Sequence, residues 1–306
     1  MAPTPLVMNS KPLVFAFLAL VTAAVCNLAA DETKSGAAQN PAFVRVMSFN
    51  VRNSKEKDGK NGWQYRKELF SETVRKFDPD ILGLQEVLAD QYDDFLKMFA
   101  DYTMVGVARD DGARKGEWAA LLFRKARFEQ IDSGNFWLSE TPDEVGSKSW
   151  NAACVRICTW AKLQDRITGS PVLIANTHFD HKSELARVQS AKLFFSRLPK
   201  LAPGAPVILI GDFNCDEDDD AYRTLVHSPL ENGMVLSDSY REVHPERSPN
   251  EASFHGFKGG IVGSRIDWIL HTPEFKATEA EIVRPAQGPY PSDHFPVTAV
   301  LEFKRQ

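Results

Sequence analysis

The sequence predicts an α/β fold, because strand-like and helix-like segments alternate from Phe43 to the C-terminal end. The strand-like segments are short apolar runs, and the helix-like segments carry apolar residues at roughly helical spacing. The chain has 306 residues, 43% of them hydrophobic and 25% charged, which is ordinary for a globular protein with a substantial core. This length allows one large domain or two small ones.

The predicted elements follow one another with clear boundaries. They are strands over 43–51, 81–87, 172–180, 207–214, 265–270 and 296–303, helices over 63–77, 91–99 and near 183–198, and several β segments between 102 and 164. Asp78-Pro79 ends the first helix. In the last strand Val297, Ala299, Leu301 and Phe303 share one face, which predicts a half-buried strand. The acidic DEDDD at 216–220 predicts a solvated turn and the start of a helix.

The N-terminal thirty residues differ in composition from the rest. Lys11 precedes LVFAFLALVTAAVCNLAA, an apolar run of signal-peptide length that ends in small residues. A membrane anchor is the alternative, but the run is short for one. We expect a signal peptide over 1–30, a linker over 31–41 and one domain over 42–306, in a protein exported to the periplasm or the medium without stable membrane insertion.

Charge and cysteine content narrow the function classes. A net charge of -5 does not indicate the extended positive surface that binds a nucleic-acid duplex tightly, although a nuclease needs only local positive charge. After cleavage Cys154, Cys158 and Cys215 remain, an odd number at no zinc-like spacing. Cys154 and Cys158 lie four residues apart in a predicted strand, which separates them by roughly 13 Å, and this is too far for a disulfide. We interpret all three as packing residues.

Polar residues interrupt six apolar strands near their ends. They are Asn50, Glu86, Asn176 with His178, Asp212 with Asn214, Asp267, and the pair Asp293-His294 just before the last strand. A single polar residue at a strand end is usually a cap. Six strands that present only Asn, Asp, Glu and His indicate a shared rim, as in active sites built on rigid sheets.

The motifs around these residues resemble those of the endonuclease/exonuclease/phosphatase (DNase I-like) superfamily. They are FN at 49–50, LQE at 84–86, NTH at 176–178, GDFN at 211–214, RID at 265–267 and SDH at 292–294. The resemblance covers about residues 43 to 304 with all six motifs in order. It implies a four-layer α/β sandwich, in which two mixed β-sheets pack face to face with helices on the outside.

The residues themselves indicate a metal-dependent reaction. Asn50, Glu86 and Asp293 offer only oxygen ligands, which suit Mg²⁺, with Mn²⁺ or Ca²⁺ as alternatives. A metal with few protein ligands keeps positions open for a phosphate oxygen. No cluster of Cys or His suits structural zinc.

The resemblance implies the catalytic roles. Asp212 would orient or deprotonate the attacking water, with Asn214 beside it, and His178 would bond the phosphate or the leaving oxygen. Asp267 would fix His294 as a cation that binds the phosphate. Pro291 and Pro296 restrict the backbone on both sides of this histidine, and we expect the pair to lie in a solvated cleft.

Candidate substrate contacts are less specific. Trp63 and Arg66, in NGWQYRKE, resemble a recurrent feature of secreted bacterial metal-dependent hydrolases of this superfamily, although an amphipathic helix explains both equally well. Arg156 and His255 are candidates to touch a second anionic or hydroxyl group, and Asn176 is a further candidate.

Three hypotheses remain open from the sequence. The first is a secreted Mg²⁺-dependent phosphoester hydrolase that uses water to attack phosphorus, and we expect a phosphodiesterase, a nonspecific nuclease included. The second is a sphingomyelinase-like phosphodiesterase, against which the short, polar segment 271–290 counts. The third is a non-catalytic binding module on the same fold, against which the complete set of acids and histidines counts. We expect a monomer that binds a phosphoester, nucleic acid being one candidate.

Overall fold

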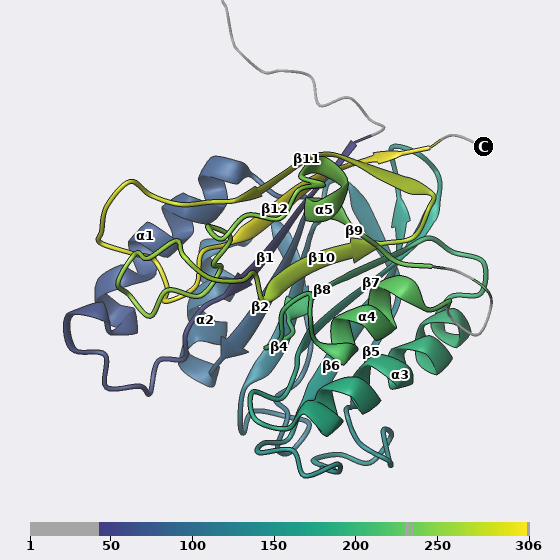
Figure 1. The fold of residues 1–306 in the computed structure, drawn as a ribbon, viewed down its shortest axis with the longest axis horizontal. Coiled ribbons are helices and arrows are strands. Elements are labelled where there is room, and N and C mark those ends of the chain that lie inside the picture. The colour runs from purple at the N-terminus through teal and green to yellow at the C-terminus, as the bar shows by residue number, and fades with distance from the viewer. Residues whose placement is uncertain (1–42, 230–232, 234, 305–306) are drawn as a thin grey trace, which may run out of the picture. The chain divides into compact units, whose positions relative to one another are not determined.

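Two mixed β-sheets pack face to face in the computed structural model, which describes residues 43–229, 233 and 235–304 (Figure 1). The predicted signal peptide and linker lie outside the described residues. The first sheet has the strand order β11 (Phe275–Ile282), β12 (Val297–Phe303), β1 (Phe43–Asn50), β2 (Ile81–Val87), β4 (Trp118–Arg124) and β3 (Tyr102–Val105). The second has the order β5 (Phe128–Trp137), β6 (Ile157–Asp165), β7 (Pro171–His178), β8 (Val207–Asp212), β10 (Asp267–His271) and β9 (Ser237–Asp238).

Helices cover the outer faces of both sheets and complete four layers. The described helices are η1 (Gly59–Asn61), α1 (Trp63–Phe77), α2 (Ala89–Met98), α3 (Glu184–Leu201), α4 (Asp220–His227) and α5 (Ser239–Val243). Phe70 of α1 and Phe95 of α2 pack with Leu84 against the first sheet. Phe194 of α3 packs against the second sheet in a cluster that includes Trp268. The predicted four-layer α/β sandwich is therefore confirmed.

The space between the sheets is filled by aliphatic side chains from both. Val46 and Ile81 from the first sheet pack in one cluster with Ile174, Ile210 and Ile269 from the second. All five are at most 1% exposed, so each contributes about 1.5–3 kcal/mol relative to an exposed side chain. This rigid core fixes the positions of the strand ends that carry the polar residues.

Helix α1 has the bounds that its apolar spacing predicts. Trp63, Phe70 and Val74 are buried on one face. The helix ends where Asp78 adopts a left-handed conformation with φ 55°, and Pro79 follows. Arg66 lies on the buried face too, which an amphipathic pattern does not predict.

One prediction about the C-terminal part is wrong. Strand β12 is not half-buried: it lies between β11 and β1, and Thr298 and Val300 on its second face are only 3% and 6% exposed. The segment 271–290, expected to be short and polar, contains the edge strand β11, which the sequence did not reveal. A register shift between Ala277 and Glu279 interrupts the alternation of apolar and polar residues that would have revealed this strand.

The sheet topology brings the polar strand ends to one edge of the sandwich. Strand β1 is parallel to β2, and β7 is parallel to β8, so their C-terminal ends lie side by side. Strand β10 is antiparallel to β8, and its first residue Asp267 pairs with Asp212, the last residue of β8. Strand β12 is antiparallel to β1, so the segment preceding Val297 reaches the same edge.

Candidate active site

A cleft of about 380 Å³ lies at this edge. Seven of the predicted site residues line it: Glu86, Arg156, His178, Asp212, Asn214, Asp293 and His294. Asn50 and Asp267 are at most 1% exposed and hydrogen-bond to residues of the lining. The six strand ends therefore form one site, as the sequence predicts.

Asp267 and His294 form a hydrogen-bonded pair. The Asp267 Oδ2 atom lies 2.9 Å from Nδ1 of His294, and Nε2 of the same ring is 3.8 Å from Oδ2 of Asp212. Burial disfavours a charged imidazole, but Asp267 and Asp212 outweigh it and raise the pKa of His294 to about 10. His294 is therefore a cation at neutral pH.

The expectation that this pair is solvated is wrong. Asp267 is 1% exposed and His294 5%, because Asp267 starts a central strand and His294 is paired with Phe254 in an isolated β-bridge. Water therefore cannot readily replace either partner of the hydrogen bond.

Two hydrogen bonds hold the carboxylate of Asp212 in place. Asn50 Nδ2 donates to its Oδ2 at 2.9 Å, and the backbone N–H of Asn214 donates to Oδ1 at 3.0 Å. Burial and the neighbouring Asp267 carboxylate raise the pKa of Asp212 to about 7, against the opposing effect of His294. A carboxylate with this pKa can accept a proton from water near neutral pH.

His178 stays neutral beside these charged groups. Its Nε2 atom lies 2.8 Å from Nδ2 of Asn214 and 3.4 Å from Oδ2 of Asp212. Burial holds the pKa of His178 well below its usual value, and the cations Arg156 and Arg109 act in the same direction. A neutral imidazole here can hydrogen-bond a substrate oxygen without adding charge.

Glu86 is aimed into the cleft by an irregularity in β2. Its φ is 62°, and the pairing of β2 with β4 shifts register between Leu84 and Val87. Arg52 and Asn214 also have left-handed φ values, of 55° and 50°. Such conformations cost about 1–3 kcal/mol each and cluster at functional sites.

Glu86 and Asp293 have the chemistry of a hard-cation site. Burial would raise the pKa of Glu86, but the hydrogen bond from Asn50 and the charge of His294 lower it below the usual value, so Glu86 is ionised. Burial and the charge of Glu86 raise the pKa of Asp293, while His294 and Arg52 oppose this. The two carboxylates thus repel one another, and a divalent cation with oxygen preference fits this donor set.

Two nearby arrangements bear on which residues hold the cation. The amide nitrogen of Asn50 donates to Glu86 at 3.0 Å and to Asp212 at 2.9 Å, so it bridges two carboxylates. Its carbonyl oxygen accepts from the N–H of Arg52 at 2.9 Å, and the role of Asn50 as a metal ligand stays a prediction. Asp212, Asp267 and His294 also bring donor atoms within 4.8 Å of one another. His294 is hydrogen-bonded to Asp267 in this second group, and Glu86 and Asp293 as the metal ligands stay a prediction.

Asn176 is not placed to contact a substrate. It is fully buried below the cleft, where its amide donates to the carbonyl oxygens of Leu84 and Ala120 and its own carbonyl accepts from Gln85. Leu84 and Ala120 are paired residues next to the register shift in β2. Asn176 therefore links the two sheets and supports the strand that presents Glu86.

Trp63 and Arg66 are structural as well. Trp63 packs in the core and donates its Nε1 proton to Asp94. Arg66 is 3% exposed, and its guanidinium donates to four carbonyl oxygens, those of Val51, Arg52, Asn61 and Pro291. The interpretation of these residues as substrate contacts is replaced by one in which Arg66 ties the end of β1 to the SDH segment.

His255 does not line the cleft either. Its ring stacks on Phe295 with centroids 3.9 Å apart and lies 4.7 Å from Tyr290, and its Nδ1 accepts from Gly259. Burial and the charge of His294 lower the pKa of His255 to about 4. His255 is a neutral core residue behind the SDH segment.

Several lining residues were not predicted from the sequence. They are Arg52, Asn53, Glu56, Arg109, Glu117, Cys154, His181, Phe254 and Ile266. Cys158 and Cys215 are buried as expected, but Cys154 is partly exposed and lines the cleft, so its interpretation as a packing residue is wrong. Arg52 follows the FN motif at once, which is a usable signal, whereas Arg109 and Glu117 come from a connection without periodicity.

Comparisons with known proteins agree with this geometry. The model of the endonuclease/exonuclease/phosphatase family matches residues 47–294. A solved structure from Bacteroides vulgatus, described by the same family name, is 38% identical with a TM-score of 0.78, covering 86% of this chain and 99% of that one. A mannosyl-6-phosphatase from Bacteroides thetaiotaomicron is 35% identical with a TM-score of 0.77, covering 85% and 100%.

Eukaryotic relatives are more distant. Nocturnin from Xenopus laevis is 25% identical over 302 residues, which cover 87% of this chain and 74% of that protein. A Ccr4 3'-5'-exoribonuclease subunit from Mycosarcoma maydis is 24% identical, and the match spans 46% of its length. Within the described ranges, the structure holds no helix long and apolar enough to cross a bilayer.

The family match spans most of the chain, and the residues of all six motifs meet at or just beneath one cleft that is lined by carboxylates, histidines and an asparagine from these motifs. This chain therefore belongs to the endonuclease/exonuclease/phosphatase family of phosphoester hydrolases.

Proposed function

We propose that this protein is an exported, Mg²⁺-dependent hydrolase that uses water to cleave the phosphoester of a small hydroxylated molecule such as a sugar phosphate. The observation that carries the proposal is the cleft itself, in which Asp212, His294 and the Glu86–Asp293 pair meet in about 380 Å³. A volume of this order is typical of small-molecule sites.

The residues divide the reaction between proton transfer and charge stabilisation. Asp212 takes a proton from the attacking water, as its pKa of about 7 allows. The new P–O bond forms as the bond to the alcohol breaks, and the alcohol oxygen leaves with the electron pair. His294, kept cationic by Asp267, binds a phosphoryl oxygen and stabilises the charge that develops there.

Two further groups complete the site. Neutral His178 lines the cleft next to Asn214 and would hydrogen-bond the phosphate or the leaving oxygen. Glu86 and Asp293 would hold the Mg²⁺ ion, which when bound supplies Lewis-acid stabilisation of the phosphoryl group.

A sugar-like substrate is supported by two observations. The Bacteroides thetaiotaomicron relative, aligned over its full length, is named a mannosyl-6-phosphatase. The net charge of -5 does not favour a long polyanion, for which basic surfaces are typical.

A phosphodiesterase or nuclease is the second candidate, because the Ccr4 relative is named an exoribonuclease subunit. A sphingomyelinase-like activity has less support, since the segment before the SDH motif forms the edge strand β11, whose outward residues are polar or charged. A purely non-catalytic role is disfavoured because the acids and histidines are present and converge.

Export is supported by Lys11 and the apolar run that follows it.

A substrate screen tests the proposal. The purified protein in Mg²⁺ is assayed for phosphate release from mannose 6-phosphate and glucose 6-phosphate, and for cleavage of bis-p-nitrophenyl phosphate, RNA, plasmid DNA and sphingomyelin. Asp212→Asn serves as the matched inactive control. We expect the highest kcat/KM on a sugar phosphate, and a higher kcat/KM on RNA or on the diester would overturn this choice of substrate.

A further inference from the structure

A second group of polar side chains lines the cleft, and the proposed reaction gives it no role. Arg109, Arg156 and His181 belong to this group, together with Cys154 and Glu117. Arg156 stands immediately before β6, and His181 follows β7 by three residues. The end of β7 thus supplies both His178 and, three residues later, a member of this additional group.

Arg156 is a buried cation whose hydrogen bonds are incomplete. It is 4% exposed, and its Nε and Nη1 atoms have no hydrogen-bond partner among the described residues. Several other described arginines also have a buried Nε without a partner, but Arg156 is the one that lacks a partner at Nη1 as well. Unfilled donors on a buried charge are costly, so Arg156 is a cation at the cleft whose hydrogen bonds the described residues do not complete.

The nearest carboxylate does not neutralise Arg156 fully. Asp180 Oδ2 is 3.8 Å from Nε of Arg156. Both oxygens of Asp180 are already occupied, because Oδ1 accepts from the N–H groups of Lys182 and Ser183, and Oδ2 from those of Ala153 and Cys154. Asp180 therefore faces Arg156 across 3.8 Å without accepting a hydrogen bond from it.

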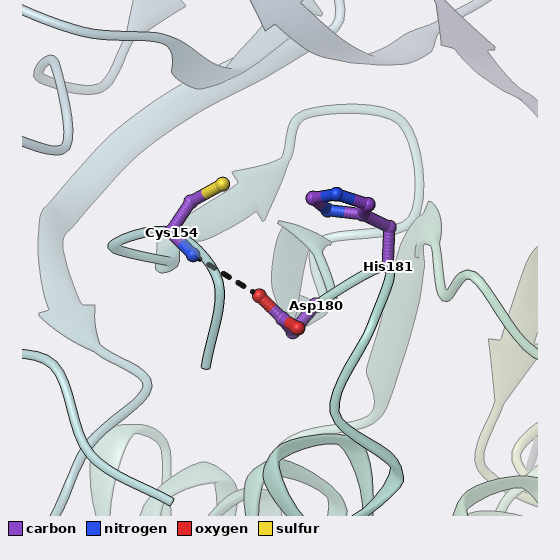
Figure 2. A group of neighbouring side chains, drawn as sticks. All are labelled: Cys154, Asp180 and His181. Atoms are coloured by element: carbon purple, nitrogen blue, oxygen red, sulfur yellow. Dashed lines mark hydrogen bonds between the residues drawn. The ribbon is translucent and has the colours of Figure 1, made fainter. Parts of the chain in front are cut away.

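The same contacts argue against a metal ion at this place. Cys154, Asp180 and His181 bring donor atoms within 4.8 Å of one another, and Figure 2 shows the thiol and the imidazole pointing toward each other above the carboxylate. However, Asp180 has no free lone pair, and the Arg156 cation lies 3.1 Å from the His181 ring. An anion suits these surroundings better than a cation.

His181 and Arg109 supply donors that can reach the cleft. A guanidinium only donates, so Nη2 of Arg156 donates to Nδ1 of His181, and the ring proton of this exposed histidine lies on Nε2. Arg109 is paired with Glu117 through Nη1. The low pKa of His178, which burial and then Arg156 and Arg109 depress, agrees with a positive potential in this part of the site.

We propose that Arg156, His181 and Arg109 form a second anion-binding subsite, which receives a phosphate or carboxylate group of the substrate other than the reacting phosphoester. Arg156 supplies charge from beneath the surface, and His181 and Arg109 supply the accessible donors. This inference rests on the proposed function and narrows its substrate class to molecules with two anionic groups.

Binding measurements in EDTA test the subsite, because binding does not require turnover. Calorimetry compares glucose 6-phosphate with glucose 1,6-bisphosphate, and a third titration with galacturonic acid 1-phosphate asks whether a carboxylate can replace the second phosphate. We expect the bisphosphate to bind at least about tenfold more tightly than the monophosphate, as for one added charge-assisted contact. In Arg156→Gln this preference falls below about twofold.

Two variants separate the subsite from a general loss of structure. Arg187→Gln is the matched control, because Arg187 also donates to the segment at Asp180 but does not line the cleft, and it should keep the preference. Arg156→Lys keeps the charge and should retain most of the preference for the bisphosphate. This variant tests whether the charge of Arg156 serves the subsite even if Arg156→Gln does not fold.

Equal affinity of the wild-type protein for both sugars would overturn the inference. So would an Arg156→Gln variant that weakens both probes by the same factor, because Arg156 would then serve the reacting phosphate. A tight bisphosphate complex without any hydrolysis in Mg²⁺ would instead refute the proposed function and leave the subsite standing.

Discussion

Replacing Asp267 by Asn removes the carboxylate that keeps His294 charged. The 2.9 Å contact joins two side chains that are at most 5% exposed, so water does not replace the lost acceptor. Loss of one electrostatic contact in the transition state costs on the order of a hundredfold to a thousandfold in kcat. We expect a fall of this size in Asp267→Asn and again in His294→Ala.

The double variant distinguishes a pair from two independent groups. Residues that act as a unit are strongly non-additive, so Asp267→Asn combined with His294→Ala should be little worse than the worse single variant. The assay is kcat on the best substrate of the screen, with Mg²⁺ affinity measured by calorimetry in parallel. The reasoning is refuted if the two losses multiply, or if Asp267→Asn weakens Mg²⁺ binding as much as it lowers turnover.

Burial of the pair also changes the expected stability. A hydrogen bond to a charged group contributes about 1.5–3 kcal/mol, so each single variant should have a lower free energy of unfolding by an amount of this order. Denaturant titration measures it, and kcat must be compared well below the unfolding transition of the least stable variant.

Three further predictions follow from residues around the site and from the N-terminal segment. Arg66→Lys cannot replace four hydrogen bonds, so it should weaken Mg²⁺ binding and lower kcat about tenfold, and an unchanged metal affinity would contradict this positioning role. Asn176→Ala leaves two buried carbonyl groups unpaired and should cost about 3 kcal/mol in a denaturant titration. Mature protein from the native host should begin near Asp31 by N-terminal sequencing, and intact Met1 in the cytosol would contradict export.

The sequence predicted correctly which residues lie together where the position of a residue in a strand determines its surroundings. Five of the site residues lie at or next to strand ends: Asn50, Glu86, His178, Asp212 and Asp267. The parallel and antiparallel pairings of the strands bring these ends to one edge, independently of the loop conformations. Apolar runs bounded by breakers therefore carried enough information to assemble the reacting groups.

The sequence was less informative where tertiary contacts decide a residue's role. Arg66 looks like a solvent-facing residue of an amphipathic helix, yet it is buried by the backbone of two distant segments. His255 faces an aromatic cluster rather than the cleft, because the SDH segment folds over it. Arg109 and Glu117 reach the cleft from an aperiodic connection, so no pattern could identify them.

The dependence on a metal held by Glu86 is the most direct test of the account. Glu86→Gln keeps the size of the side chain but removes the charge that attracts a cation, and one of its two accepting oxygens, which receive hydrogen bonds from Asn50 and Asn53, becomes a donor. Phosphate release in Mg²⁺ and metal affinity by calorimetry are measured for the wild-type protein and this variant, and the wild-type protein is also assayed in EDTA. We expect hydrolysis by the wild-type protein to vanish in EDTA and to return with Mg²⁺ or Mn²⁺. The Glu86→Gln variant should lose both hydrolysis and tight metal binding. Full activity in EDTA, or unchanged Mg²⁺ affinity in Glu86→Gln, would contradict the central claim.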